Sequence, residues 1–215
     1  AGRMISRLLL AASLALPALY AQNPQTDWPS YGHDPGGQRY SPLKQINTSN
    51  VSKLAPAWTY SMRKEGQPFR LSQSIPLMVD GILYLGYPYN HVAALVPETG
   101  KLLWEFTANT KLRTTLGSMR SLAYWPGDKQ LSPQILFGTE DGELYSINAK
   151  TGKLNPGFGN EGIVNLKTPE VMNGYMNFQY GITSAPFVIK NLVITGAHVV
   201  DETGSKGPAG DIRAW

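Results

Sequence analysis

Short apolar runs separated by polar turns recur along the chain from residue 74 onward. Residues 76–79 and 82–86 flank one Asp-Gly turn, and residues 134–138 and 143–147 flank another. Two runs rich in β-branched and aromatic residues, joined by such a turn, are typical of an antiparallel hairpin. The pattern therefore predicts consecutive hairpins and an all-β fold.

A longer unit repeats around these hairpins. Residues 92–102 match residues 144–154, and their Thr-Gly-Lys cores begin 52 residues apart. Residues 184–189 parallel residues 74–79 at an offset of 110, close to twice that period. A period of this length is typical of a β-propeller, in which each repeat forms one small sheet. Residues 211–215 then predict the strand that would enter a third turn of the same kind.

The first residues have the pattern of a secretory signal peptide. Arg7 is followed by a mostly apolar run over residues 8–19 and then by Ala21, a small residue suited to a cleavage site. The run is short for a membrane span, although a retained signal anchor stays open as the alternative. We therefore expect residues 1–21 to be removed on export, and the protein to be periplasmic, either free there or associated with the membrane.

Two regions follow the signal segment. Residues 22–56 are rich in Pro, Gly, Asn and Ser, and predict an extended wrap with a helical turn at residues 47–54. The propeller repeats occupy residues 57–215, starting with a strand at residues 56–61 and interrupted by a loop at residues 155–180 that crosses one face. Known propellers have about four to eight blades. Because about three repeats are present, we expect the chain to be the N-terminal part of a longer protein.

Composition excludes several classes of protein. The formal net charge is +4, and it falls to +2 without Arg3 and Arg7, which is too small to indicate a nucleic-acid partner. The chain has no cysteine, so these residues contain neither a disulfide nor a thiolate metal site nor a lipoprotein anchor.

Further segments carry a pattern beyond the repeat. They are Asp27-Trp28-Pro29-Ser30-Tyr31-Gly32, Arg39-Tyr40-Ser41-Pro42, Ala57-Trp58-Thr59 and Arg120-Ser121-Leu122-Ala123-Tyr124-Trp125. In order and spacing they resemble the pyrroloquinoline-quinone (PQQ) dependent dehydrogenases, which are eight-bladed quinoprotein propellers. The resemblance implies a partial propeller of four-stranded antiparallel blades. Residues 152–166 are most similar to the glucose, quinate and polyol branch, and the region of Ser118 and Met119 lacks the adjacent cysteines of methanol-type relatives.

The resemblance also implies which residues contact PQQ, a planar quinone with three carboxylates. Arg120 matches an arginine that binds a cofactor carboxylate, a task suited to a guanidinium. Thr183 matches a hydroxyl donor, Gln73 falls where relatives often carry a glutamate, and His198 lies in the loop beneath the cofactor. Asp201 matches the acidic Ca²⁺ ligand of methanol-type relatives, a hard oxygen donor. An exposed or packing role is the alternative for each residue.

The tryptophans are expected to serve packing. Trp104 stands where the family has a tryptophan that docks neighbouring blades. Trp28, Trp58, Trp125 and Trp215 are likewise expected to pack against other residues and not to relay electrons.

By the same resemblance, the complete protein would oxidise an alcohol, a sugar or a polyol by hydride transfer to PQQ with Ca²⁺ assistance. A membrane quinone or a cytochrome c would accept the electrons. The family's catalytic base and most of its metal ligands lie in later repeats, so we assign no catalytic residue here and expect this part alone to be inactive. A non-enzymatic propeller scaffold stays open as the alternative. A sugar-binding surface built on Tyr84, Tyr87 and Tyr89 is another, although packing also explains these residues.

Overall fold

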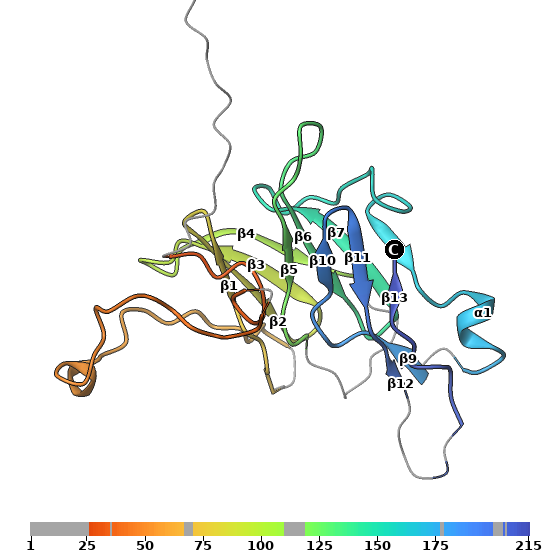
Figure 1. Ribbon diagram of the computed structural model, residues 1–215, viewed down its shortest axis with the longest axis horizontal. Coiled ribbons are helices and arrows are strands. Elements are labelled where there is room, and N and C mark those ends of the chain that lie inside the picture. The colour runs from red at the N-terminus through yellow and green to blue at the C-terminus, as the bar shows by residue number, and fades with distance from the viewer. Residues whose placement is uncertain are drawn as a thin grey trace, which may run out of the picture.

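The computed structural model describes residues 26–34, 36–66, 71–109, 119–176, 179–199, 204 and 206–215. Strands are the main regular secondary structure in these ranges (Figure 1), and the helices there are short, namely η1 (Val51–Lys53) and α1 (Pro169–Met172). No helix within them has the length and apolar character needed to cross a membrane. The signal segment predicted at residues 1–21 lies outside the described residues.

Antiparallel sheets follow one another along the chain. The first has the order β1 (Leu77–Val79), β2 (Ile82–Tyr87), β3 (His91–Leu95) and β4 (Leu102–Thr107). The second has the order β5 (Ala123–Trp125), β6 (Gln134–Gly138), β7 (Glu143–Asn148) and β8 (Ile163–Asn165). The third has the order β10 (Phe187–Ile189), β11 (Leu192–Thr195) and β13 (Arg213–Ala214), and β9 (Tyr180–Gly181) pairs with β12 (His198–Val199).

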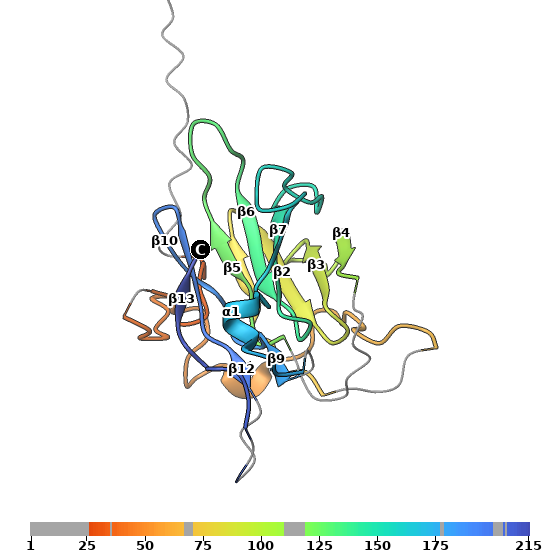
Figure 2. The ribbon, with the colours of Figure 1, turned by 90° about the vertical axis from the view of Figure 1, so that its right-hand side faces the viewer.

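The first strands of the sheets lie side by side, so the sheets diverge from a common line (Figures 1 and 2). Strand β5 contacts β10, and a parallel bridge joins Ile75, before β1, to Ser121, before β5. This is the radial arrangement of a β-propeller. The predicted fold class and the predicted hairpins are therefore confirmed, as is a strand near residues 211–215, where β13 pairs with β11.

A tryptophan docks on the Thr-Gly-Lys turn of each of the first two sheets. The Trp58 indole N–H donates to the carbonyl of Pro97 at 2.8 Å, and the Trp104 indole N–H donates to the carbonyl of Ala149 at 3.0 Å. In both cases the acceptor lies three residues before the glycine of the turn. A Cβ on Gly152 would lie 2.6 Å from the Trp104 ring, so only glycine fits beneath the indole. The predicted packing role of Trp104 is thus confirmed.

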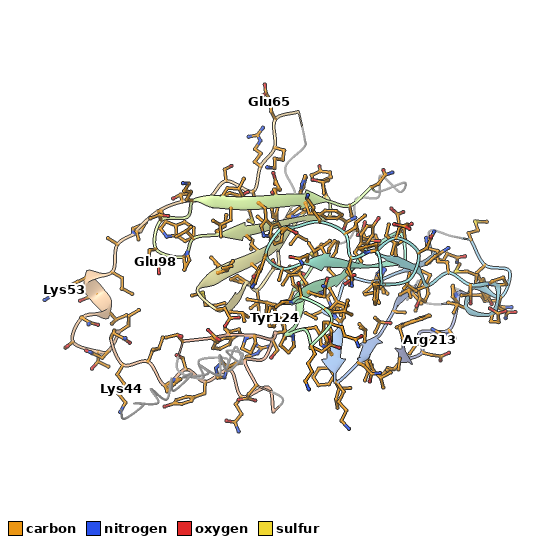
Figure 3. All side chains as sticks on the ribbon, turned by 90° about the horizontal axis from the view of Figure 1, so that it is seen from above. Lys44, Lys53, Glu65, Glu98, Tyr124 and Arg213 are labelled. Carbon is orange, nitrogen blue, oxygen red and sulfur yellow. The ribbon has the colours of Figure 1, made fainter. Side chains whose placement is uncertain are left out.

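Local predictions outside the repeats had mixed outcomes. The prediction of a strand at residues 56–61 is wrong, because no described segment pairs with this extended stretch and a strand needs a hydrogen-bonding partner. The helical turn expected at residues 47–54 is confirmed as η1. The loop expected at residues 155–180 contains β8 and α1. The tip of the segment at residues 38–57 lies away from the sheets, and Lys44 and Lys53 mark it (Figure 3).

The core fills the spaces between successive sheets. One buried cluster, which includes Tyr84, Leu122, Phe137 and Ile147, joins the first two sheets. Another joins the second sheet to the third. Tyr84 is 2% exposed and Tyr87 is fully buried, so these tyrosines serve packing and cannot form the sugar-binding surface considered above.

Candidate cofactor site

The segments that lead into β1, β5 and β10 meet through backbone hydrogen bonds. The amide of Arg120 donates to the carbonyl of Thr183 at 3.0 Å, and the amide of Ile75 donates to the carbonyl of Arg120 at 2.9 Å. The buried hydroxyl of Ser121 also donates to the carbonyl of Ile75, at 2.9 Å. These contacts hold the entries to the three sheets side by side, at the same end of the fold.

The side chains of Arg120 and Gln73 come together at this junction. Nε of Arg120 donates to Oε1 of Gln73 at 3.4 Å, and Arg120 is exposed. Within the described ranges, no carboxylate lies within ion-pair distance of this guanidinium. The hydroxyl of Ser74, next to Gln73, is buried and has no hydrogen-bond partner. The junction therefore offers a cation and hydrogen-bonding groups to a ligand.

The structure also places the other predicted residues. Thr183 is half-buried and shares the backbone hydrogen bond described above. His198 is exposed and pairs across β12 and β9 with Gly181, two residues before Thr183. Asp201 lies outside the described residues, and among those described no group of three His, Asp or Glu side chains could hold a metal ion. The assigned contacts to a cofactor and a metal stay predictions.

A cavity of about 480 Å³ lies beside the junction. Its walls come from the segment around Ser30 and Asp34, from Arg120 and Tyr124, and from Phe187. Gln73, Thr183 and His198 do not line it. We place the candidate site on the side of Arg120 that faces Gln73, because the polar groups gather there, and not in the cavity.

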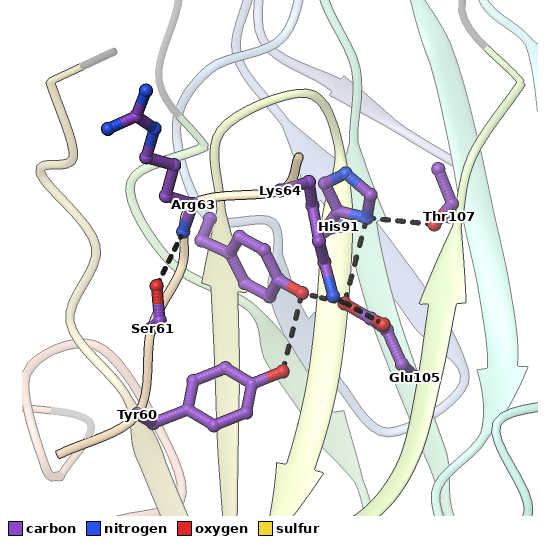
Figure 4. A network of polar contacts seen from close by, with 8 residues as sticks. Tyr60, Ser61, Arg63, Lys64, His91, Glu105 and Thr107 are labelled. Atoms are coloured by element: carbon purple, nitrogen blue, oxygen red, sulfur yellow. Dashed lines mark hydrogen bonds and ion pairs between the residues drawn. The ribbon is translucent and has the colours of Figure 1, made fainter. Parts of the chain in front are cut away.

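A second polar cluster occupies the same end of the first sheet (Figure 4). It consists of Tyr60, Lys64, Tyr87, His91, Glu105 and Thr107. Nζ of Lys64 lies 2.6 Å from Oε1 of Glu105, and the hydroxyl of Tyr87 donates to the same carboxylate. Nδ1 of His91 lies 2.8 Å from Oγ1 of Thr107. The cluster ties the segment around Lys64 to the ends of β2, β3 and β4. No sequence motif indicated it.

The cluster predicts a pH dependence of stability. Burial, together with the charge of Lys64, lowers the pKa of His91 below its ordinary value. The unfolded chain then binds a proton near pH 6.5 that the folded chain does not yet bind. This contribution to stability is present above about pH 6.5 and is lost as the pH falls through the pKa of the folded state. We expect the melting temperature of the complete protein to fall less between pH 7.5 and pH 5.5 in His91→Asn than in the wild type. Equal slopes would show that His91 is not the responsible group.

The divergent antiparallel sheets define a β-propeller, and an exposed guanidinium lies beside polar side chains where the chain enters them. Comparison with known proteins specifies the class. Residues 28–215 match a family model for PQQ propellers, described as "Glucose/ethanol/alcohol dehydrogenase, beta-propeller domain". The chain belongs to this family of PQQ-dependent dehydrogenase propellers.

Individual relatives support the same family. The chain is 30% identical over 206 residues to the quinoprotein glucose dehydrogenase of Escherichia coli (strain K12), and the aligned region covers 88% of this chain and 25% of that protein. It is 35% identical over 207 residues to the dehydrogenase subunit of the alcohol dehydrogenase (quinone) of Gluconobacter oxydans (strain 621H). The aligned region covers 87% of this chain and 25% of that subunit. The crystal structure of the quinohemoprotein alcohol dehydrogenase from Comamonas testosteroni matches with a TM-score of 0.63 and 30% identity, over 84% of this chain and 24% of that chain. The chain thus spans about a quarter of the length of these relatives.

Proposed function

We propose that this chain is the N-terminal part of a PQQ-dependent dehydrogenase that oxidises a hydroxyl group of an alcohol, a sugar or a polyol. The proposal is carried by one observation, the convergence of Arg120, Gln73 and Thr183 at the entry to the sheets. When bound, PQQ supplies the acceptor for the hydride. A membrane quinone or a cytochrome c would then take up the electrons.

The groups at the junction suit PQQ, a planar quinone with three carboxylates. Gln73 engages Nε of Arg120, which leaves the two terminal nitrogens of the guanidinium to bind a carboxylate in bidentate fashion. The hydroxyl of Thr183 would donate to a cofactor oxygen. His198 would contact the cofactor from β12.

We propose Ca²⁺ as the metal, with Asp201 as one ligand, because a carboxylate is a suitable donor for this hard cation. The remaining ligands and the base that removes the hydroxyl proton would come from other parts of the complete protein. The chain alone is therefore expected to be inactive. Export through residues 1–21 would place the protein in the periplasm, free or associated with the membrane.

Reconstitution tests the proposal. The complete protein is prepared without cofactor and supplied with PQQ and Ca²⁺, and reduction of an artificial electron-accepting dye is followed with a panel of sugars, polyols and alcohols. We expect dye reduction that requires both PQQ and one class of substrate, and none from this chain alone. A complete, folded protein that neither binds PQQ nor reduces the dye with any substrate would instead favour the scaffold alternative.

A further inference from the structure

Gly86 and Gly138 occupy equivalent positions near the ends of the second strands β2 and β6. They are 52 residues apart, which is the period of the repeat. Neither glycine has a positive φ, so the backbone conformation at these positions is open to any residue. Glycine must therefore be required at these positions because there is no room for a larger side chain.

An apolar side chain from the segment that leads into the next sheet fills that space at both glycines. A Cβ on Gly86 would lie 2.3 Å from the sulfur of Met119 and 3.1 Å from Leu122. A Cβ on Gly138 would lie 2.2 Å from Cγ2 and 2.4 Å from Cβ of Ile182. Carbon atoms in contact are normally about 3.5–4.0 Å apart. Any larger residue would therefore displace Met119 or Ile182.

The displaced residues stand directly before residues of the candidate site. Met119 precedes Arg120, and Ile182 precedes Thr183. Met119 and Ile182 are buried, at 5% and 2% exposure. Ile182 is also tied to the end of β6, because its amide donates to the carbonyl of Thr139 at 2.8 Å. Each apolar side chain packs directly on its glycine, and its position fixes the backbone of the next residue. The glycines therefore determine where Arg120 and Thr183 lie in the junction.

We propose that Gly86 and Gly138 are positioning residues for the cofactor site, which act by seating Met119 and Ile182 so that Arg120 and Thr183 adopt the spacing that PQQ needs. The inference rests on the proposed function. It assigns the glycines no contact with the cofactor. The direct link between the two site residues, the 3.0 Å hydrogen bond from the amide of Arg120 to the carbonyl of Thr183, is what a displaced Ile182 would disturb first.

Gly138→Ala in the complete protein is the test, and Gly81→Ala is its matched control. A Cβ on Gly81 would have no neighbour within 4 Å, and its φ of +74° makes alanine costly there for backbone reasons alone. Gly81 lies in the turn between β1 and β2, at the opposite end of the sheet from the junction. The control therefore destabilises the fold without touching the site.

Two readouts are compared. Hydrogen–deuterium exchange of the cofactor-free protein should become about tenfold or more faster in peptides that contain the Arg120 amide in Gly138→Ala, but not in Gly81→Ala. The dissociation constant for PQQ should rise by about 100-fold in Gly138→Ala, the loss expected when a displaced Arg120 no longer forms its charged hydrogen bonds to the cofactor. It should change by less than twofold in the control. Unchanged exchange and unchanged affinity in a folded Gly138→Ala protein would overturn the inference.

A softer variant keeps the test decisive if Gly138→Ala does not fold. Gly86→Ala presses on the sulfur of Met119, a flexible side chain that can yield, whereas Ile182 is branched at Cβ and stiff. We expect Gly86→Ala to show the same two effects at smaller size, namely about threefold faster exchange and a dissociation constant for PQQ that is about tenfold higher. If the wild-type protein does not bind PQQ, the proposed function fails, and the exchange of the Arg120 amide still decides whether the glycines position the junction.

Discussion

Arg120→Ala is expected to raise the dissociation constant of the complete protein for PQQ by about 10- to 100-fold. Hydrogen bonds that involve a charged group contribute about 1.5–3 kcal/mol, and each 1.4 kcal/mol corresponds to about a factor of ten in affinity. The guanidinium has no carboxylate partner within the described ranges, so its loss should cost cofactor binding more than folding. Titration of the cofactor-free protein with PQQ, followed by tryptophan fluorescence, measures the effect.

Two further variants separate charge from geometry. Arg120→Lys keeps the positive charge but loses the planar fork, so an intermediate loss of affinity is expected. Arg63→Ala removes an exposed arginine from the segment beside the Glu105 cluster and should leave PQQ affinity unchanged. Wild-type affinity in Arg120→Ala would exclude the arginine from the site.

Trp104→Ala is expected to destabilise the protein by about 3 kcal/mol, the lower end of the range for large aromatic deletions, because the indole is only half-buried. The substitution removes the ring that covers Gly152 and the hydrogen bond to the carbonyl of Ala149. It also removes a contact with Tyr84, whose ring centroid lies 6.1 Å away. Urea unfolding of the complete protein measures the loss.

The matched variant is Trp104→Phe, which keeps an aromatic ring over Gly152 but has no donor for Ala149. It should cost about 1 kcal/mol, the contribution of the lost hydrogen bond, because the ring contacts are retained. Leu102→Ala, on the same strand and 42% exposed, should stay within about 0.5 kcal/mol of the wild type. Equal stability of Trp104→Ala and Leu102→Ala would show that the tryptophan does not dock the two sheets.

The hairpins were predictable from sequence because local signals determine them. Asp80 and Gly81 both have positive φ, as the tight turn between β1 and β2 requires, and the apolar runs beside them become the paired strands. The repeat then predicted the second and third sheets from the first. Local pattern and long-range pairing agree here, so the positions of these strands follow from short windows of sequence.

Other features depend on contacts between residues that are far apart in the sequence, so no short segment predicts them. The stretch at residues 56–61 has a strand-like composition, yet no described segment pairs with it. The cluster around Glu105 draws side chains from four segments, and no spacing relates them. The spaces left by Gly86 and Gly138 become visible only when Met119 and Ile182 are seen to fill them.

The candidate site lies between these cases. The resemblance to a family selected four residues, namely Gln73, Arg120, Thr183 and His198. The structure brings the first three to one junction. His198 pairs with Gly181, two residues before Thr183. Their contacts with a cofactor stay predictions. The role of Asp201 does too, since it lies outside the described residues.

The crystal structure of the complete protein reconstituted with PQQ tests the central claim most directly. The account predicts PQQ at the entry to the sheets, with the Arg120 guanidinium about 3 Å from a cofactor carboxylate and the Thr183 hydroxyl within hydrogen-bond distance of another cofactor oxygen. PQQ bound elsewhere, or bound there with Arg120 turned to solvent, would contradict it.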